Sequence, residues 1–343
     1  MYNYDVVTIG SATRDALVKS KELAVRKNRA KRGLEESIVL PLGTKIRIEK
    51  MFFGTGGAGT NTAVTFARQK FRVAAVANVG NDPGGRAVIE ELKKEHVDAR
   101  FVRLDLKEHT AYSVVLEPIS GERVILTYRG ANEALRGEII PFSKFRAPWV
   151  YLSSLSGDLS ILKRAIRLKK KYATRLAWNP GGGDLALGLR KLRPFLKYMD
   201  VFLVNQEEAA RLLGIPYRSV EKVFKKFDEI IDGIAVMTRG PKGVIVSDGK
   251  TMWRAGIFKE KAVVDRTGAG DSFGSGFVAG LIRKTRKKQF TDDGILYALR
   301  LGSANATSKV EYVGAKTGLL TKHEFESQKR WKHLPFSIEK IRI

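Results

Sequence analysis

The segment that most constrains this chain is a glycine-rich turn leading into a helix, Thr267-Gly268-Ala269-Gly270-Asp271. It follows the β-branched pair Val263 and Val264 and precedes a largely apolar run, so the sequence predicts a short strand, a turn and a helix. Such a turn leaves unpaired backbone N–H groups at a helix N-terminus, where the helix dipole also favours negative charge. The two glycines let the backbone approach a ligand closely, because no Cβ intervenes. We therefore expect an anion-binding site at this turn.

Asp271 stands directly beside this expected anion site. A carboxylate next to free amides suits the transfer of a phosphoryl group to a hydroxyl, because the amides hold the charge while the carboxylate takes the proton. The alternative is that Asp271 only caps the helix, since Asp is favoured at helix N-termini and glycine is common in ordinary turns. The tetrapeptide alone does not separate these two interpretations.

Composition places the chain among globular proteins with a substantial core. Its 343 residues are 43% hydrophobic and 29% charged, and no apolar run is long enough to span a bilayer. The absence of cysteine excludes a disulfide framework, a thiol nucleophile and a cysteine-based zinc site. Residues 1–5 lack the basic start and apolar core of a signal peptide. We therefore expect a cytoplasmic protein that does not bind membranes.

The formal net charge of +26 is the compositional anomaly. Much of it lies in three basic clusters, residues 19–32, 163–175 and 283–288. A basic patch can bind nucleic acid through phosphate contacts. However, the second and third clusters fall on helical patterns, where cations on solvated faces and near helix ends are ordinary. None of the three interleaves aromatic side chains for base stacking, so we do not expect nucleic acid to be the main partner.

Strand-like and helix-like segments alternate along most of the chain, which predicts an α/β fold with a mainly parallel sheet. The predicted strands are residues 5–10, 73–80, 149–152, 175–178, 201–204 and 234–238, and helices are predicted at residues 60–69 and 86–94. Two regions interrupt the alternation: residues 37–53 suggest extended strands, and residues 111–128 suggest a hairpin with its turn at 119–122. No linker divides the chain, so we expect one domain over residues 1–343.

Three motifs carry a family resemblance. Asp265 to Asp271 resembles the signature D-T-x-G-A-G-D of the PfkB (ribokinase-like) sugar and nucleoside kinases, with Arg266 in place of its Thr. Gly56 to Asn61 resembles the N-terminal signature G-G-x-G-x-N, and residues 205–208 match N-x-x-E. Weaker matches follow the family order at residues 10–15, 78–85, 129–132, 238–243, 303–306 and 314–316. P-loop, Rossmann and hydrolase-elbow motifs are absent.

The resemblance implies a ribokinase-like three-layer α/β/α sandwich with a mainly parallel central sheet and a small β-sheet lid. It favours lid strands within residues 37–53 and 111–128 over edge strands of the main sheet. It also implies an ATP-dependent kinase that transfers the γ-phosphoryl group to a hydroxyl of a sugar or nucleoside. Asp271 would be the base, and the amides of Gly268, Ala269 and Gly270 would form the anion hole.

The resemblance assigns the remaining site residues by their motifs. The residues expected to hold the acceptor are Asp15, Gly56, Gly57 and Asn61. The residues expected to hold ATP are Asn205, Glu208, Thr238, Gly240, Gly243 and Asn305, the last in a segment placed with residues 314–316 on the adenine side. Glu208 would place Mg²⁺ through water, since this hard cation keeps several waters. Many relatives hold K⁺ partly through the residues that match Asp265 and Thr267, and Arg266 leaves potassium dependence open here.

The acceptor stays open at this point. Ribokinases usually carry Lys where this chain has Ala58, and residues 178–181 replace the usual D-x-N pattern of sugar kinases. Ribose and a nucleoside such as adenosine are the leading candidates, and a sugar phosphate is the third. The alternative function that is not enzymatic is that of a non-catalytic protein of the same fold, which binds a nucleoside or nucleic acid. We also hypothesise a homodimer through the lid, to which the insertion at residues 19–34 could contribute.

Overall fold

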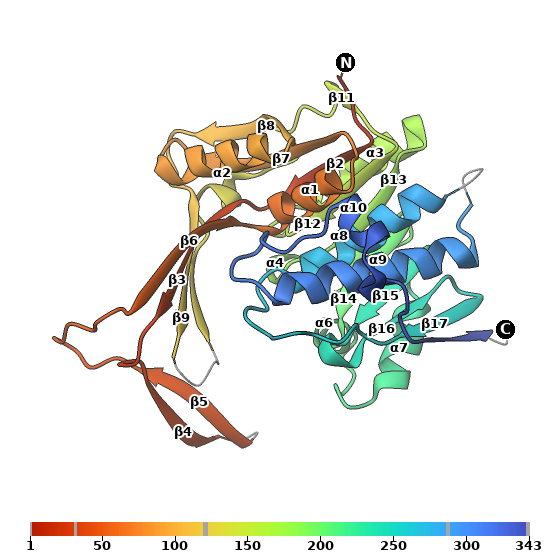
Figure 1. The fold of residues 1–343 in the computed structure, drawn as a ribbon. Coiled ribbons are helices and arrows are strands. Elements are labelled where there is room, and N and C mark those ends of the chain that lie inside the picture. The colour runs from red at the N-terminus through yellow and green to blue at the C-terminus, as the bar shows by residue number, and fades with distance from the viewer. Residues whose placement is uncertain (1, 31–32, 119–122, 286–288, 341–343) are drawn as a thin grey trace.

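The computed structural model describes residues 2–30, 33–118, 123–285 and 289–340. Its centre is a ten-stranded sheet in the order β18-β17-β16-β15-β14-β13-β12-β2-β7-β8 (Figure 1). Neighbouring strands from β8 to β15 are parallel, and the pairings from β15 to β18 are antiparallel. In chain order the strands are β2 (Val6–Gly10), β7 (Val73–Gly80), β8 (Asp98–Asp105), β12 (Trp149–Ser153), β13 (Arg175–Asn179), β14 (Val201–Asn205), β15 (Ile234–Thr238), β16 (Val244–Ser247), β17 (Thr251–Ala255) and β18 (Phe336–Lys340).

Helices cover both faces of this sheet. One face carries α1 (Ala58–Arg68), α2 (Pro83–Lys94), α8 (Ala269–Lys284), α9 (Asp292–Val310) and α10 (Lys322–Ser327). The other carries α3 (Leu159–Tyr172), α4 (Gly182–Leu185), α5 (Leu189–Leu196), α6 (Gln206–Leu213) and α7 (Val220–Asp228). Each face has its own hydrophobic cluster: Tyr151 belongs to the first and Val150 to the second, because successive strand side chains point to opposite faces. The predicted three-layer α/β/α sandwich is confirmed.

A second sheet of four strands extends from this body as an arm (Figure 1). Its order is β10 (Val124–Tyr128), β9 (Ala111–Glu117), β3 (Thr13–Lys19) and β6 (Lys50–Gly56). A separate hairpin of β4 (Ala24–Ala30) and β5 (Gly33–Val39) lies at the far end of this arm, and β1 (Tyr2–Asn3) pairs with β11 (Phe145–Arg146). Short 3₁₀ helices are η1 (Gly130–Ala134), η2 (Gly240–Lys242) and η3 (Lys329–Trp331). We call the four-stranded sheet the lid.

The lid contains strands that the sequence patterns missed. Residues 50–53, 111–117 and 124–128 of the predicted ranges lie in it, whereas residues 37–39 belong to the β4–β5 hairpin. The predicted turn at 119–122 lies outside the described residues. The β3 strand directly after the first strand is not among the predicted strands, and neither is the hairpin of β4 and β5, which begins in the 19–34 insertion and ends at Val39. The pairing of β3 with β6 and β9, which come much later in the chain, is what makes this mixed sequence a strand.

The prediction of a short strand at Val263 and Val264 is wrong. Both side chains are exposed, at 44% and 39%, and the segment is irregular. The backbone N–H of Val264 donates to the carbonyl oxygen of Val310 at 2.8 Å, and that of Asp265 donates to the same oxygen at 3.1 Å. β-Branched residues form strands only where a neighbouring strand can pair with them, and here the end of α9 occupies that place.

The basic clusters lie mostly on surface elements. Residues 163–171 are on α3, and α8 ends at Lys284, while residues 286–288 of the third cluster lie outside the described residues. The described part of the chain has no helix long and apolar enough to cross a membrane.

Candidate active site

The glycine-rich turn begins helix α8 as predicted. Gly268 is the N-cap residue with a φ of 76°, a left-handed conformation that favours glycine. The N–H of Ser272 donates to the carbonyl of Gly268 at 2.8 Å, which closes the first helical turn. The N–H of Ala269 donates to the carbonyl of Arg266 at 3.2 Å, so this amide is already engaged. Within the described chain, the N–H groups of Gly268, Gly270 and Asp271 have no hydrogen-bond acceptor, and these three amides are available to an anion.

Asp271 accepts a hydrogen bond from a residue that is distant in the sequence. The Nδ2 of Asn61 in α1 donates to Asp271 Oδ2 at 2.9 Å, across 210 residues of sequence. The Oδ1 of Asn61 is buried and has no hydrogen-bond partner in the described chain, so it can accept a hydrogen bond from a bound hydroxyl. Burial raises the pKa of Asp271, while the Asn61 hydrogen bond and the charge of Lys316 act in the opposite direction. A carboxylate with a raised pKa is a stronger base than an ordinary Asp.

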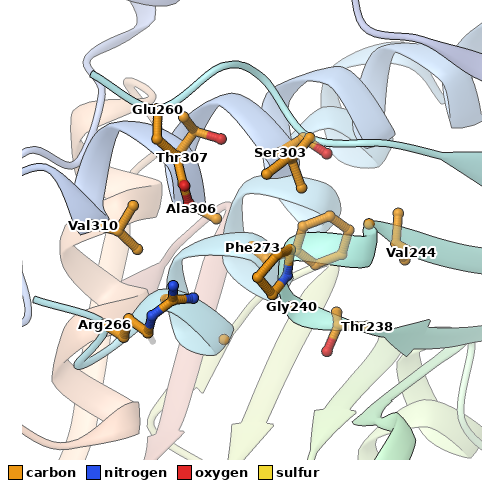
Figure 2. Close-up of a pocket in the computed structure, with 15 residues that line it drawn as sticks. Thr238, Gly240, Val244, Glu260, Arg266, Phe273, Ser303, Ala306, Thr307 and Val310 are labelled. Carbon is orange, nitrogen blue, oxygen red and sulfur yellow. The ribbon is translucent and has the colours of Figure 1, made fainter. Parts of the chain in front are cut away.

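Two adjoining cavities meet at the glycine-rich turn. The larger has a volume of ≈ 330 Å³ and is lined by Asp271, Asn205, Glu208 and residues of several strand ends. The smaller, of ≈ 230 Å³, lies toward η2 and α9 (Figure 2). Five residues line both: Thr238, Arg266, Ala269, Gly270 and Phe273. The turn therefore stands at the boundary between the two cavities.

The larger cavity also contains a second carboxyl group at the start of α6. Asn205 Oδ1 accepts the N–H of Glu208 at 2.8 Å, and Glu208 Oε2 accepts the N–H of Asn205 at 2.8 Å, which is a capping box. Burial raises the pKa of Glu208, and the charge of Asp271 adds to this effect. The remaining oxygen of Glu208 is free of this box.

The donor set fits Mg²⁺ but no dedicated metal cage. In the described ranges, no three His, Asp or Glu side chains come together as a metal site. Mg²⁺ is usually bound by one or two carboxylates, several waters and substrate phosphates, rather than by a cage of protein ligands. Glu208, facing the cavity beside the glycine-rich turn, has the oxygen chemistry for such a site.

The acceptor residues predicted at the base of the lid lie together but outside both cavities. Thr13 Oγ1 donates to Asp15 Oδ1 at 3.0 Å, and the Asp15 carboxylate lies against Gly56. Burial raises the pKa of Asp15. Gly57 has a φ of 93°, and a Cβ there would lie 2.5 Å from the carbonyl oxygen of Ser11. Ser11 and Ala58, the neighbours of these residues, line the larger cavity.

The predicted nucleotide residues divide in two. Thr238, Gly240 and Gly243 line the smaller cavity. Asn305 does not line either cavity and is completely buried. Its Nδ2 donates to the carbonyl of Ser272 at 2.8 Å, and its Oδ1 accepts the N–H of Leu320 at 2.8 Å. Asn305 therefore joins α8 to the segment after α9, and the expectation that it contacts a nucleotide is corrected. Its neighbours Ser303 and Ala306 do line the smaller cavity (Figure 2).

Lys316 is a site residue that the sequence analysis misplaced. Its Nζ donates to Thr55 Oγ1 at 2.5 Å and to Glu91 Oε2 at 2.9 Å, and its side chain is 4% exposed. Its charge opposes the rise that burial causes in the pKa of both Asp15 and Asp271, so it lies on the acceptor side and not on the expected adenine side. Only the folding of the loop after α9 toward the lid brings it there.

Arg266 points toward the middle of the smaller cavity (Figure 2). It is exposed, and it lines both cavities. A guanidinium group at the boundary of two compartments is well suited to bind phosphate oxygens in a bidentate way.

The predicted monovalent-cation residues are already surrounded by protein groups. Asp265 Oδ1 accepts hydrogen bonds from the N–H of Thr267 at 2.8 Å and from Arg123 Nη1 at 2.6 Å. Lys309 Nζ lies 3.8 Å from Asp265 Oδ2. The Thr267 hydroxyl is buried and has no hydrogen-bond partner among the described residues. Burial raises the pKa of Asp265, but Lys309 and the hydrogen bonds outweigh this and leave the pKa below its ordinary value.

Comparisons with known proteins agree with this geometry. The model of the pfkB family carbohydrate kinases matches residues 5–322. The ribokinase of Haemophilus influenzae is 28% identical over 275 residues, which are 78% of this chain and 85% of that protein. The structure of Arabidopsis thaliana ribokinase complexed with ribose and ATP superposes with a TM-score of 0.75 at 22% identity, covering 97% of this chain and 100% of that one. The nucleoside kinase of Methanocaldococcus jannaschii superposes with a TM-score of 0.74 at 20% identity, covering 97% and 99%.

Proposed function

Because the chain belongs to the PfkB family of carbohydrate kinases, we propose that it transfers the γ-phosphoryl group of ATP to a hydroxyl of a sugar or nucleoside, with Asp271 as the base. The observation that carries this proposal is the hydrogen bond between Asn61 and Asp271, beside the glycine-rich turn at which the two cavities meet. It supports the proposal because a carboxyl group of raised pKa then lies next to free amides, as a base would where an acceptor hydroxyl and a phosphoryl group meet.

In the proposed phosphoryl transfer, Asn61, Asp271 and the amides of the turn each have a separate role. Asn61 holds Asp271 through Oδ2, which leaves Oδ1 to accept the proton of the acceptor hydroxyl. The hydroxyl oxygen then bonds to the γ-phosphorus as the bond to the β-phosphate oxygen breaks, and ADP leaves. The amides of Gly268 and Gly270 stabilise the charge on the transferred group. Mg²⁺ near Glu208 would supply neutralisation of the phosphate charge.

We assign the donor to the smaller cavity and its continuation at the turn. Thr238, Gly240 and Gly243 offer backbone at close range, while Phe273, Ala306 and Val310 offer the apolar surface on which a base can lie. Arg266 would contact the phosphates, since its guanidinium lies where the two cavities join. This arrangement gives a function to the residue by which the chain departs from the family signature.

The lining of the larger cavity favours a neutral acceptor. Its ionisable groups are Asp271, Glu208 and Arg266, of which the two carboxylates would repel a phosphate on the acceptor. Ribose or a nucleoside is therefore favoured over a sugar phosphate. We treat the whole chain as one kinase domain, in which the lid would close over Asp15 and Asn61 and exclude water.

The experiment that tests this function is ATP consumption with Mg²⁺ against a panel of acceptors: ribose, adenosine, other nucleosides, fructose and sugar phosphates. One acceptor should give a strong signal that Asp271→Asn removes. Glu207→Gln, a neighbouring helix acid outside both cavities, is the matched control and should keep the signal. Folded protein that neither binds nor consumes ATP would favour a non-catalytic binding protein instead, and steep weakening of nucleic-acid binding with salt would identify that class.

A further inference from the structure

One buried carboxylate, that of Asp265, fastens the glycine-rich turn to the rest of the protein. Its Oδ1 accepts the N–H of Thr267 at 2.8 Å, and its Oδ2 accepts the N–H of Gly314 at 2.9 Å. The first bond holds the start of the turn, and the second holds the loop after α9. Gly268 packs against Ala315 of that same loop. The position of the free amides therefore depends on how Asp265 is held.

A lysine ammonium group is buried beside this carboxylate. Lys309 lies in the last turn of α9, where a cation is favourable, and its side chain is 0% exposed. Its Nζ donates to the backbone oxygen of Asp265 at 2.7 Å and lies 3.4 Å from the backbone oxygen of Tyr312. It also lies 3.8 Å from Asp265 Oδ2. An ammonium group among carbonyl and carboxylate oxygens has the charge and the surroundings of a bound monovalent cation.

The charges around Asp265 leave no place for another cation. Arg123, which directly precedes β10, donates through Nη1 to Asp265 Oδ1 at 2.6 Å, so one carboxylate already faces two cations. Arg266 adds a further positive charge one residue along the chain. A K⁺ ion at this point would be repelled by all three, and repulsion is strongest where side chains exclude water. The K⁺ site implied by the family resemblance therefore does not fit this chain.

We propose that the ammonium group of Lys309 holds Asp265 and the glycine-rich turn in place from within the chain, so that the protein needs no monovalent cation. Lys309 is a positioning residue, because it acts through Asp265 and lines neither cavity. The effect on turnover rests on the proposed kinase function. The effect on cation binding does not.

The activity test compares KCl with choline chloride at equal ionic strength, using the acceptor found in the panel. Wild-type turnover should differ by less than about twofold between the two salts. Lys309→Ala should lose about tenfold or more in choline chloride, since it removes charged hydrogen bonds to buried oxygens. Ammonium or methylammonium chloride should restore part of this loss by supplying a cation to the vacated space.

The second readout is the melting temperature, which requires no turnover. KCl and choline chloride should give the wild type the same value, whereas ammonium chloride should raise that of Lys309→Ala, because a ligand that binds only the folded state stabilises it. The matched control is Lys169→Ala, which also removes a lysine in the last turn of a helix, α3, that is paired with a carboxylate, Asp200. It should show no specific response to ammonium.

Activation of the wild type by KCl, or a rise in its melting temperature in KCl over choline chloride, would overturn the proposal. So would full turnover of Lys309→Ala in choline chloride. If Lys309→Ala does not fold, the two wild-type measurements still decide. If no acceptor is phosphorylated, the kinase function fails, but the melting temperatures continue to test the cation site.

Discussion

Asp265 and Asp271 stand at the two ends of one glycine-rich turn, yet their surroundings are opposite. Asp265 is 5% exposed and faces Arg123, Lys309 and two backbone N–H groups. Asp271 faces an open cavity and receives one neutral hydrogen bond, from Asn61. The pKa of Asp265 lies below its ordinary value, since its partners outweigh burial, and that of Asp271 lies above it because of burial.

These different surroundings give the two carboxyl groups different roles, although in the sequence both are simply Asp residues that flank the turn. A carboxylate surrounded by cations and amides stays ionised and fixes the backbone, but it is a weak base. A carboxylate with few partners is costly to keep ionised, but it takes a proton readily. The turn therefore has an anchor at one end and a base at the other.

The sharpest test of the comparison is Asp271→Asn. The variant should lose on the order of 10²-fold or more in turnover, as removal of a general base does. Its free energy of unfolding should change little, because Asn preserves the shape and no charged side chain of the described residues lies within hydrogen-bonding distance of the Asp271 carboxylate. Steady-state kinetics and urea unfolding measure the two quantities. Wild-type turnover in this variant would remove Asp271 from the mechanism.

For Asp265→Asn, in contrast, we expect a large loss of stability. It leaves the buried ammonium of Lys309 without its carboxylate, and breaking a buried pair in this way costs about 3 kcal/mol of stability. Asp200→Asn is the matched control, since its partner Lys169 is 27% exposed and can be solvated. Urea unfolding of both variants checks this. Equal losses in the two would show that Asp265 is no special anchor.

The two carboxyl groups should also separate in their pH dependence. The pKa of Asp271 in the folded protein is raised. Turnover should therefore begin to fall with decreasing pH while the pH is still above 3.8, the ordinary pKa of Asp. The folded pKa of Asp265 is lowered, so its contribution to stability is complete above 3.8 and is lost as the pH falls through the lower folded value. The pH profile of kcat/KM and melting temperatures across the same range measure both. Parallel loss of rate and stability would contradict the separation.

The smallest effect is expected for Arg123→Gln. This side chain is 27% exposed and reaches Asp265 from the position directly before β10, at the end of the lid hairpin farthest from Ala111. Because Lys309 remains in place, the loss of stability should be about 1 kcal/mol or less. Loss of this link between lid and turn should raise KM for the acceptor more than it lowers kcat. Arg103→Gln, an exposed arginine on β8, serves as the control and should change neither.

The local parts of the fold could be read directly from the chain. β7 coincides with the strand predicted at residues 73–80, and β15 with that at residues 234–238. The turn before α8 also lies where its motif predicts. Each of these depends on neighbours within a few residues, because side-chain alternation, backbone φ and capping bonds are local properties.

The partners of the site residues could not be read in this way. The bond between Asn61 and Asp271 joins positions 210 residues apart, and the lid obtains β3 only through pairing with β6 and β9. The same motif logic misassigned Asn305, because a motif names a residue but not the side on which its helix presents it.

The sequence by itself determined the chemistry available at the turn: glycines that permit the backbone conformation, free amides at a helix start, and an acid beside them. Only the tertiary structure decided which acid is the anchor and which is the base. The reason is that the pKa of a carboxyl group follows from its burial and its charged neighbours. For Asp265 those neighbours are Arg123 and Lys309, which lie on elements distant in the chain and meet only when the protein folds.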